Sequence, residues 1–255
     1  MSGAEASARF WDGAPCGRGD SFEERSATRF KREPWVPALL GEVATHSDIV
    51  EVGCGQGTDA LWICKSMRPG GRYRALDHSE QSLASARAAC AEIAAIPVTP
   101  VFSREDALAL PMPDNSVACV YSCGVIHHID DTEGAAAEIH RILQPGGRCY
   151  VMIYRTTSPK LLVAHLLRGA QSIVDTLTRR KQSLLRAAEV LGLDRLDGTT
   201  MVRECFGVPV LKSYTKAGAR QLFSQFDIVS VSARGFLWLV EARKPHPTGP
   251  RAPSR

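Results

Sequence analysis

Short apolar runs alternate with helix-like stretches through the middle of this chain, and this alternation limits the fold more than any other feature. Strands are predicted at 49–52, 72–76, 98–102, 116–121 and 148–153. Helices are predicted at 58–67, directly after Ser79, and at 132–143. Strands joined through helices favour right-handed crossovers and parallel pairing, so we expect an α/β fold.

The alternation stops after residue 154 and resumes near residue 216. In between, two amphipathic helices are predicted on either side of a basic segment, at 161–167 and 183–193. A further helix and two strands follow, and the strands suit an antiparallel pair at a sheet edge: 216–223, 227–233 and 236–242. The chain therefore predicts a Rossmann-like, doubly wound, mostly parallel sheet with an antiparallel edge strand and a helical insertion.

The same pattern divides the chain into five predicted parts. They are a helical lid or cap (1–47), a Rossmann-like ligand-binding core (48–154), a helical insertion that covers the acceptor (155–210), the end of the core sheet (211–243) and a disordered, Pro-rich tail (244–255).

Composition excludes several classes of protein. A chain of 255 residues with 44% hydrophobic and 23% charged residues is typical of a soluble globular protein. Its net charge of +4 is mild, whereas nucleic-acid binders concentrate more basic charge on one face. No apolar stretch approaches the length of about 18 residues that spans a bilayer, and residues 1–10 contain no signal-peptide core. We therefore expect a cytoplasmic monomer or homodimer without a nucleic-acid partner or a membrane span.

The cysteines indicate neither a disulfide framework nor a metal site. The chain has 8 of them, and none forms a C-x-x-C pair or completes a zinc-finger spacing with a histidine. Cys119 and Cys149 lie in apolar runs, where a free thiol acts as a small core residue.

A glycine-rich turn follows the first predicted strand, in the sequence Glu51-Val52-Gly53-Cys54-Gly55-Gln56-Gly57. Glycines allow a tight turn and a close approach of the backbone to a ligand. A helix begins directly afterwards, so its free N–H groups point at whatever occupies the turn. The spacing is G-x-G-x-G, which differs from the G-x-G-x-x-G fingerprint of NAD and FAD sites, and no lysine completes a P-loop.

An acid completes this pattern at the end of the second predicted strand. Asp77 can accept two hydrogen bonds from the hydroxyl groups of a ribose. Ligands of open α/β sheets bind at the carboxyl ends of the strands, and the turn and Asp77 belong to that edge. The alternative is that the glycines only form a tight turn and that Asp77 caps the next helix. The combination favours a nucleoside-type ligand.

Four segments resemble the successive motifs of class I S-adenosylmethionine (SAM)-dependent methyltransferases, and a later one, SYTKAGARQLFSQFDIVSVSAR, resembles the closing portion of the bacterial small-molecule type. The four segments cover about residues 49–154 in the family's order and read IVEVGCGQGTDA, YRALDHSEQSLASAR, REDALALPMPDNSVACVYSCGVIHHIDD and EIHRILQPGGRCYVMIY. The resemblance implies SAM as cofactor, with its methionine end over the turn at 53–57.

The resemblance also implies roles for single residues. Glu51 would meet the methionine amino group, Asp77 the ribose and His78 the adenine. Asp106 would receive the adenine amino group, with Ala107 beside it, and the Cys123 carbonyl would meet the methionine amine. The predicted cofactor residues are Glu51, Gly53, Cys54, Gly55, Gly57, Asp77, His78, Ser82, Asp106, Ala107 and Cys123.

Two histidines after the fourth predicted strand are the candidates for a catalytic base. The sulfonium of SAM already activates its methyl group, so a base is needed only where the acceptor arrives protonated. Histidine suits this task because its ordinary pKa lies close to neutral. His128 ranks above His127, because its position matches one from which some relatives reach the substrate. Alternatively, the pair only shapes the loop.

The acceptor pocket is predicted from aromatic and cationic residues at the same edge. Phe10 and Trp11 lie in a stretch with little other apolar content, which favours a lid. Tyr154, Arg155 and Tyr214 either line the pocket or pack beside it.

Three hypotheses of function remain open. The first is methyl transfer from SAM to oxygen or nitrogen of a small, partly apolar specialised metabolite. The second is carbon methylation of a quinone or lipid-like acceptor. The third is a SAM-binding protein without transfer activity. Methylation of nucleic acid is disfavoured, because Ser122-Cys123-Gly124-Val125 replaces the polar-Pro-Pro-aromatic tetrapeptide of amino-methylating nucleic-acid enzymes.

Overall fold

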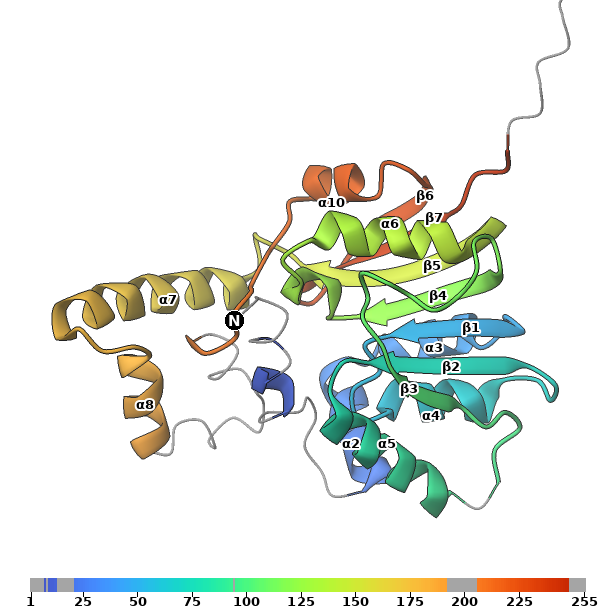
Figure 1. Cartoon of the computed structure of the whole chain (residues 1–255), viewed down its shortest axis with the longest axis horizontal. Coiled ribbons are helices and arrows are strands. Elements are labelled where there is room, and N and C mark those ends of the chain that lie inside the picture. Colours follow the sequence, from blue (N-terminus) through green and yellow to red (C-terminus); the bar gives the residue numbers. More distant parts are fainter. Residues whose placement is uncertain (1–6, 8, 13–20, 94, 192–205, 248–255) are drawn as a thin grey trace, which may run out of the picture.

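The computed structural model describes residues 7, 9–12, 21–93, 95–191 and 206–247. A seven-stranded sheet in the order β3-β2-β1-β4-β5-β7-β6 forms its centre (Figure 1). The strands are β1 (Asp48–Val52), β2 (Arg72–Asp77), β3 (Val101–Arg104), β4 (Val117–Cys123), β5 (Leu143–Tyr154), β6 (Asp227–Arg234) and β7 (Leu237–Arg243). The predicted α/β class is confirmed.

The directions of the strands determine at which edge of the sheet a crevice for a ligand forms. The strands β1 to β5 pair in parallel. Strand β7 is antiparallel to both β5 and β6, and β6 is the last strand on that side of the sheet. From β1 the chain builds outward to β2 and β3 on one side, and then returns to add β4 and β5 on the other. Loops diverge at such a switch point and leave a crevice at the carboxyl ends of the strands.

Helices cover both faces of the sheet. They are α2 (Phe22–Arg32), α3 (Val36–Val43), α4 (Thr58–Ser66), α5 (Glu80–Glu92), the 3₁₀ turn η1 (Ile126–His128), α6 (Thr132–Ile142), α7 (Pro159–Thr178), α8 (Ser183–Val190) and α10 (Lys216–Leu222). α7 and α8 lie beyond the carboxyl ends of the strands, near residues 9–12 (Figure 1). No helix in the described part of the chain is long and apolar enough to cross a membrane.

Alternating side chains divide the core into two layers. Ile49 belongs to a cluster with α3 and α4, whereas its neighbour Val50 belongs to a cluster with α6 and α10. Cys119 and Val120 divide in the same way on β4. Because successive strand residues face opposite sides, buried apolar runs of this kind need helices on both faces.

Several predicted boundaries are displaced. β3 begins at Val101 instead of residue 98, after Pro100, which has no N–H to donate to a neighbouring strand. α7 is 20 residues long and passes well beyond the predicted end at 167, because its apolar spacing continues past Gly169. Ser158 caps its start by accepting the N–H of Leu161 at 3.3 Å.

Parts of the predicted lid and tail contact the body of the protein. α3, within the lid 1–47, packs in the first core cluster through Val36, Leu40 and Val43. The tail, predicted from 244, begins with a lysine whose Nζ donates to the His140 carbonyl at 2.6 Å. Residues 248–255 lie outside the described residues. The functional division into a lid, a core and an insertion stays a prediction.

Candidate functional site

A cavity of about 390 Å³ opens at the carboxyl ends of β1, β2 and β4. Its volume lies in the range of small-molecule sites. It is formed by the turn after β1, the end of β2, the loop after β3, the segment around η1 and two N-terminal residues. Its lining is Ser7, Trp11, Val52, Gly53, Gly55, Leu76, Asp77, His78, Ser79, Ser82, Glu105, Asp106, Ala107, Leu108, Leu110, Cys123, Gly124, Val125, His128, Ile129, Asp130 and Asp131.

Two positions of the turn have no room for a side chain and require glycine, and a third glycine faces the open cavity. Gly53 and Gly57 have φ angles of +81° and +76°, and a Cβ at either position would collide with a neighbouring side chain. A Cβ on Gly55 would meet nothing within 4 Å, and Gly55 lines the cavity. The backbone of the turn is thus exposed to a ligand at Gly55, while its flanks are closely packed.

Asp77 joins the end of β2 to this turn. Its Oδ2 accepts the N–H of Gly55 at 2.7 Å, and its Oδ1 accepts the N–H of Ser79 at 2.9 Å. Burial raises the pKa of this carboxyl group, and the backbone donors oppose that shift. The backbone of His78 also bonds to this carboxylate, and a carboxylate has about four lone-pair sites, so at least one remains after these bonds. The side chain can therefore hold the turn and still accept hydrogen bonds from a ligand in the cavity.

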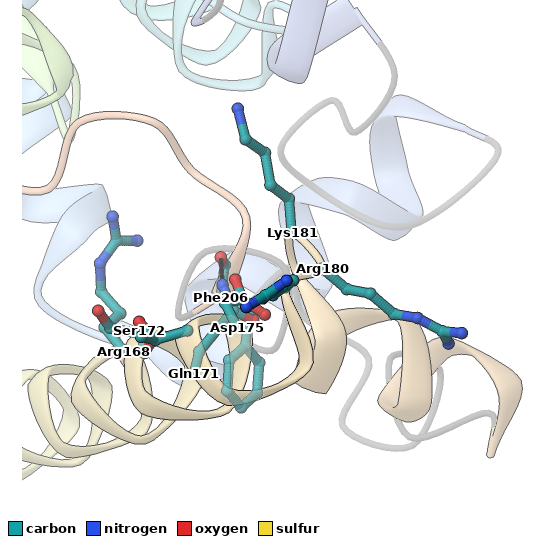
Figure 2. Close-up of a pocket in the computed structure, with 9 residues that line it drawn as sticks. Arg168, Gln171, Ser172, Asp175, Arg180, Lys181 and Phe206 are labelled. Carbon is teal, nitrogen blue, oxygen red and sulfur yellow. Dashed lines mark hydrogen bonds between the residues drawn. The ribbon is translucent and has the colours of Figure 1, made fainter.

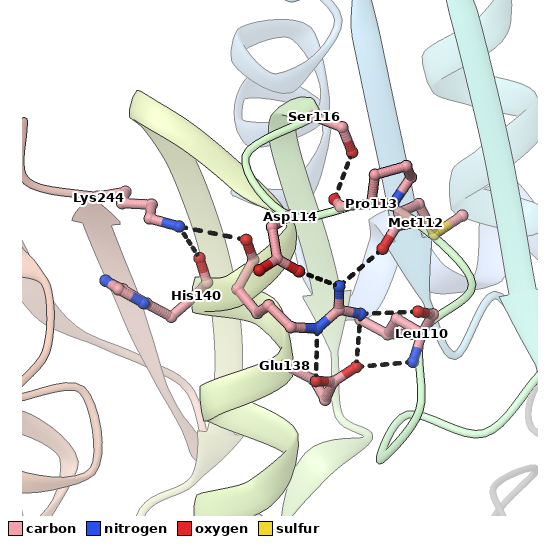
Figure 3. A network of polar contacts seen from close by, with 9 residues as sticks. Leu110, Met112, Pro113, Asp114, Ser116, Glu138, His140 and Lys244 are labelled. Carbon is pink, nitrogen blue, oxygen red and sulfur yellow. Dashed lines mark hydrogen bonds and ion pairs between the residues drawn. The ribbon is translucent and has the colours of Figure 1, made fainter.

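Arg141 of α6 holds the loop after β3 through hydrogen bonds to Leu110 and Met112, two of the residues labelled in Figure 3. Arg141 donates to the carbonyl groups of Leu110 and Met112 at 2.8 Å each, and it pairs with Glu138 and Asp114. Glu138 in turn accepts the N–H of Leu110 at 2.8 Å, and Arg141 lowers the pKa of Glu138. One arginine thereby fixes a loop whose residues 105–108 and 110 line the cavity.

Arg141→Leu is expected to weaken binding of SAM several-fold. The variant leaves two carbonyl groups and Glu138 without their donor, and we expect a loss of about 1–3 kcal/mol in the free energy of unfolding. Calorimetric titration with SAM and urea unfolding measure the two effects. Arg148→Leu is the control, because Arg148 pairs with Glu42 and does not contact the cavity loop. Unchanged SAM affinity in Arg141→Leu would mean that the loop does not need this support.

His128 lines the cavity and is held by a distant backbone carbonyl. Its Nδ1 lies 2.8 Å from the carbonyl oxygen of Val210, which can only accept, so Nδ1 carries the proton. In this tautomer Nε2 is the basic nitrogen. The ring also makes edge contacts with Trp11 and Tyr154, at centroid distances of 5.2 and 5.4 Å. His128 therefore has a defined orientation and a nitrogen that can accept a proton.

His127 occupies a different environment. It is fully buried, its ring stacks on Tyr154 at 3.9 Å, and neither ring nitrogen has a hydrogen-bond partner among the described residues. Burial lowers its pKa well below the ordinary value, and the charges of His128 and Lys160 lower it further. His127 does not line the cavity, so its neutral ring packs beneath the site.

The buried His127 makes a prediction about stability and pH. Its folded pKa lies below its unfolded pKa, so as the pH falls below about 6.5 the unfolded chain binds a proton that the folded chain does not. This costs about 1.4 kcal/mol of stability per pH unit, down to the lowered pKa. Comparing urea unfolding of wild type and His127→Phe between about pH 7.5 and about pH 5.5 isolates this contribution, since other groups titrate in both.

The wild type should lose more stability than His127→Phe over this range. Equal losses in wild type and His127→Phe would show that His127 becomes protonated in the folded protein.

Eight of the predicted site residues do not line the cavity. They are Glu51, Cys54, Gly57, His127, Phe10, Tyr154, Arg155 and Tyr214. Phe10 and Tyr154 lie one layer out, since their rings contact the cavity residues Trp11 and His128. Arg155 instead donates to the Gly235 carbonyl at 3.0 Å and lies over Trp238. Tyr214 packs in the second core cluster. The roles predicted for all eight stay predictions.

Glu51 belongs to a buried polar layer beneath the glycine turn. It accepts the hydroxyl of Tyr73 at 2.8 Å, and burial raises its pKa well above the ordinary range. Nearby, Arg29 of α2 pairs with Asp59 of α4 through Nε and Oδ1 at 2.7 Å. The hydroxyl of Tyr121 also donates to Asp59, at 2.7 Å. This layer fixes α2 against the start of α4, directly below the turn.

The sequence analysis did not identify the Arg29–Asp59 pair, the Arg141 support or the Val210 carbonyl. Arg29 and Asp59 are separated by 30 residues, and Val210 lies 82 residues from His128. A charged residue on an amphipathic helix is normally solvated, so nothing in the local pattern marks Arg29 or Arg141. A backbone carbonyl leaves no trace in a sequence at all.

Comparisons with known proteins agree with this geometry. The family model described as "Methyltransferase domain" matches residues 50–151. A probable SAM-dependent methyltransferase of Mycolicibacterium smegmatis is 34% identical over 119 residues, which are 46% of this chain and 42% of that protein. A demethylmenaquinone methyltransferase of Thermus thermophilus is 36% identical over 104 residues, or 41% of this chain and 46% of that protein.

A solved structure extends the likeness over nearly the whole chain. Magnesium protoporphyrin IX methyltransferase of Synechocystis, determined with bound SAH, superposes with a TM-score of 0.56 at 15% identity and covers 94% of this chain and 93% of that one. At this identity the likeness concerns the fold. The chain spans less than half the length of the curated relatives named above.

Proposed function

We propose that this chain, whose residues 50–151 match a methyltransferase domain, is a class I SAM-dependent methyltransferase that transfers a methyl group from SAM to oxygen or nitrogen of a small, partly apolar acceptor. The observation that carries this proposal is the orientation of His128. Its Nδ1–H is committed to the Val210 carbonyl, and its ring lines the same cavity as Asp77. A hydroxyl or ammonium acceptor needs a base of this kind, whereas the glycine turn and Asp77 alone would only bind the cofactor.

The residues present fit SAM. When bound, SAM supplies a methyl group that its sulfonium already activates. The backbone at Gly55 is open to the cavity, and Asp77 keeps lone pairs that suit ribose hydroxyls. Leu76 and Leu108 offer apolar surface to an adenine, and Asp106 offers a carboxylate. His78, Ser82, Ala107 and Cys123 also line the cavity, which supports the cofactor roles proposed for them.

The other side chains of the cavity would orient the acceptor and exclude water. Trp11, Val125 and Ile129 surround His128 with apolar surface, so an apolar acceptor is favoured there. Alignment of the acceptor atom behind the methyl group, at about 3–3.5 Å, supplies much of the rate enhancement. His128 would take the proton of the acceptor at Nε2, and the Val210 carbonyl would stabilise the resulting imidazolium through Nδ1–H.

Carbon methylation of a quinone or lipid-like acceptor is the second candidate. The demethylmenaquinone methyltransferase of Thermus thermophilus, which matches 41% of this chain, favours it. The same base serves this reaction, because removing a phenolic proton raises the electron density on the neighbouring ring carbons. The geometry around His128 is therefore compatible with both reactions, and the product decides between them.

The first experiment is calorimetric titration of the purified protein with SAM and, separately, with NAD. Micromolar binding of SAM alone is expected. SAM with a ¹³C-labelled methyl group is then supplied with hydroxylated aromatic compounds, quinols and small amines. The chemical shift of the new methyl group distinguishes transfer to oxygen, nitrogen or carbon. Transfer only to carbon would replace the leading proposal with the second. SAM binding without transfer to any of these acceptors would favour a non-catalytic protein.

A further inference from the structure

One face of α7 carries large apolar side chains that are exposed to solvent. Leu162, Leu166, Ile173 and Leu177 are 53%, 75%, 63% and 79% exposed. Their spacings of four, seven and four residues place them in one line along the helix. We call these four residues the apolar stripe. Single exposed leucines are common, but a continuous line along a 20-residue helix marks an interaction surface.

The opposite face of α7 packs against the rest of the protein and forms hydrogen bonds with it. Leu161 and Ala164 are buried in it. Arg168 donates to the Val208 carbonyl at 3.0 Å, and Gln171 donates to the Phe206 carbonyl at 2.8 Å. The helix is therefore fixed with its apolar stripe turned outward, and rotation about its own axis would break these contacts.

A cluster of cations follows the end of the apolar stripe. Arg179, Arg180 and Lys181 are exposed and, with Arg168, border an open hollow of about 500 Å³ (Figure 2). Asp175 is the carboxylate among the lining residues, and it already accepts the N–H groups of Gln182 and Ser183 at 2.8 Å each. The hollow lies on the face of α7 that carries Arg168 and Gln171, opposite the apolar stripe, whereas the exposed cations at residues 179–181 follow the end of the helix.

We infer that α7 docks on an anionic lipid surface, with the apolar stripe in the interfacial region and residues 179–181 on the lipid headgroups. An amphipathic helix with an apolar face and nearby basic residues has the properties of such an interfacial anchor. Clustered Lys and Arg residues are attracted to anionic headgroups.

Charge also argues against a second copy of the chain as the occupant. Parallel pairing of two stripes would bring both cationic clusters together. Antiparallel pairing would bring each cluster to the first turn of α7, which contains no acidic residue. The acid of α7, Asp175, is held at the start of α8. A lipid surface supplies the negative charge that neither arrangement offers.

Docking would bring the cavity close to the lipid. α7 and the cavity lie at the same end of the sheet (Figure 1), and the segment that α7 holds, 206–213, includes the Val210 carbonyl that orients His128. An acceptor dissolved in the membrane could then enter the site directly. This last step rests on the proposed function, whereas the docking itself does not.

Flotation of the full chain with vesicles tests the proposal. The probes are vesicles of phosphatidylglycerol and phosphatidylcholine in equal parts, and vesicles of phosphatidylcholine alone. Binding to the anionic vesicles is expected, and it should weaken as salt is added. The stripe variant Leu166→Gln/Leu177→Gln and the charge variant Arg180→Gln/Lys181→Gln should each bind at least about tenfold more weakly.

Two variants elsewhere on the surface are matched controls. Val229→Thr removes an exposed apolar residue from β6, and Lys65→Gln/Arg68→Gln removes two charges from the end of α4 and the loop after it. Both should bind vesicles as the wild type does. Calorimetry with SAM checks that every variant is folded, and it also separates a failure of docking from a failure of the proposed function.

Three results would overturn the inference. The first is absence of binding to anionic vesicles by a wild type that binds SAM. The second is equal binding by the stripe variant, the charge variant and the wild type. The third is a wild-type dimer in sedimentation equilibrium that the stripe variant abolishes while vesicles bind neither form, which would assign the stripe to a second copy.

Discussion

His128→Asn is expected to lower turnover about 10²–10⁴-fold and to leave the affinity for SAM unchanged. The amide nitrogen of Asn can take the place of Nδ1 and donate to the Val210 carbonyl, which His128 does at 2.8 Å. The variant therefore keeps the contact with segment 206–213 and removes only the basic nitrogen. Turnover is measured with the acceptor found in the labelled-methyl screen, and SAM affinity by calorimetry.

A second readout separates a base from a packing residue. His128→Gly removes the ring, and added imidazole should restore part of the lost turnover if the ring acts as a base. His165→Asn is the control, because His165 lies on α7 and bonds to Ser213 outside the cavity. If His128→Asn turned over as fast as the wild type, His128 would not be the base, and its role would be structural.

Asp77→Asn is expected to weaken SAM binding by about 100-fold. Hydrogen bonds to a charged group contribute about 1.5–3 kcal/mol each, and a ribose offers two hydroxyls, so a loss near 3 kcal/mol corresponds to about 100-fold. The amide would also direct its own N–H groups at the backbone donors of Gly55 or Ser79, which the carboxylate now accepts at 2.7 and 2.9 Å. Calorimetric titration with SAM measures the effect.

Glu105→Gln provides the matched control for Asp77→Asn. Glu105 lines the same cavity and carries the same charge, but its side chain does not contact the glycine turn. Its replacement should change SAM affinity little, and thermal unfolding verifies that both variants are folded. If Glu105→Gln weakened binding and Asp77→Asn did not, the ribose would lie elsewhere in the cavity.

The sequence predicted the strands and turns that form the cavity more accurately than the directions of the side chains around it. The strand–helix alternation predicted the parallel core, and the turn at 53–57 and Asp77 were predicted to meet, as they do through the Gly55 N–H. Ten of the predicted site residues line the cavity: Gly53, Gly55, Asp77, His78, Ser82, Asp106, Ala107, Cys123, His128 and Trp11. These residues meet at one cavity because parallel strands bring their carboxyl ends to one edge of the sheet, and their roles stay predictions.

Predictions of side-chain direction were weaker. Tyr154 and Arg155 are adjacent at the end of β5, yet Tyr154 contacts the histidines and Arg155 turns to the hairpin of β6 and β7. Adjacent residues in extended chain point to opposite sides, and packing decides which side faces the cavity. The long apolar stripe of α7 was likewise missed, since the sequence indicated a shorter helix.

The sequence by itself determined the α/β frame, and its resemblance to a known family indicated the cofactor. The frame follows from apolar periodicity, and the glycine turn with the acid at a strand end predicted the edge of the sheet at which the cavity opens. Only the tertiary structure decided between the two histidines. Val210, 82 residues away, orients His128 beside the cavity, while burial against Tyr154 keeps His127 neutral. The environments of the two rings differ because Val210 fixes the tautomer of His128, whereas burial lowers the pKa of His127.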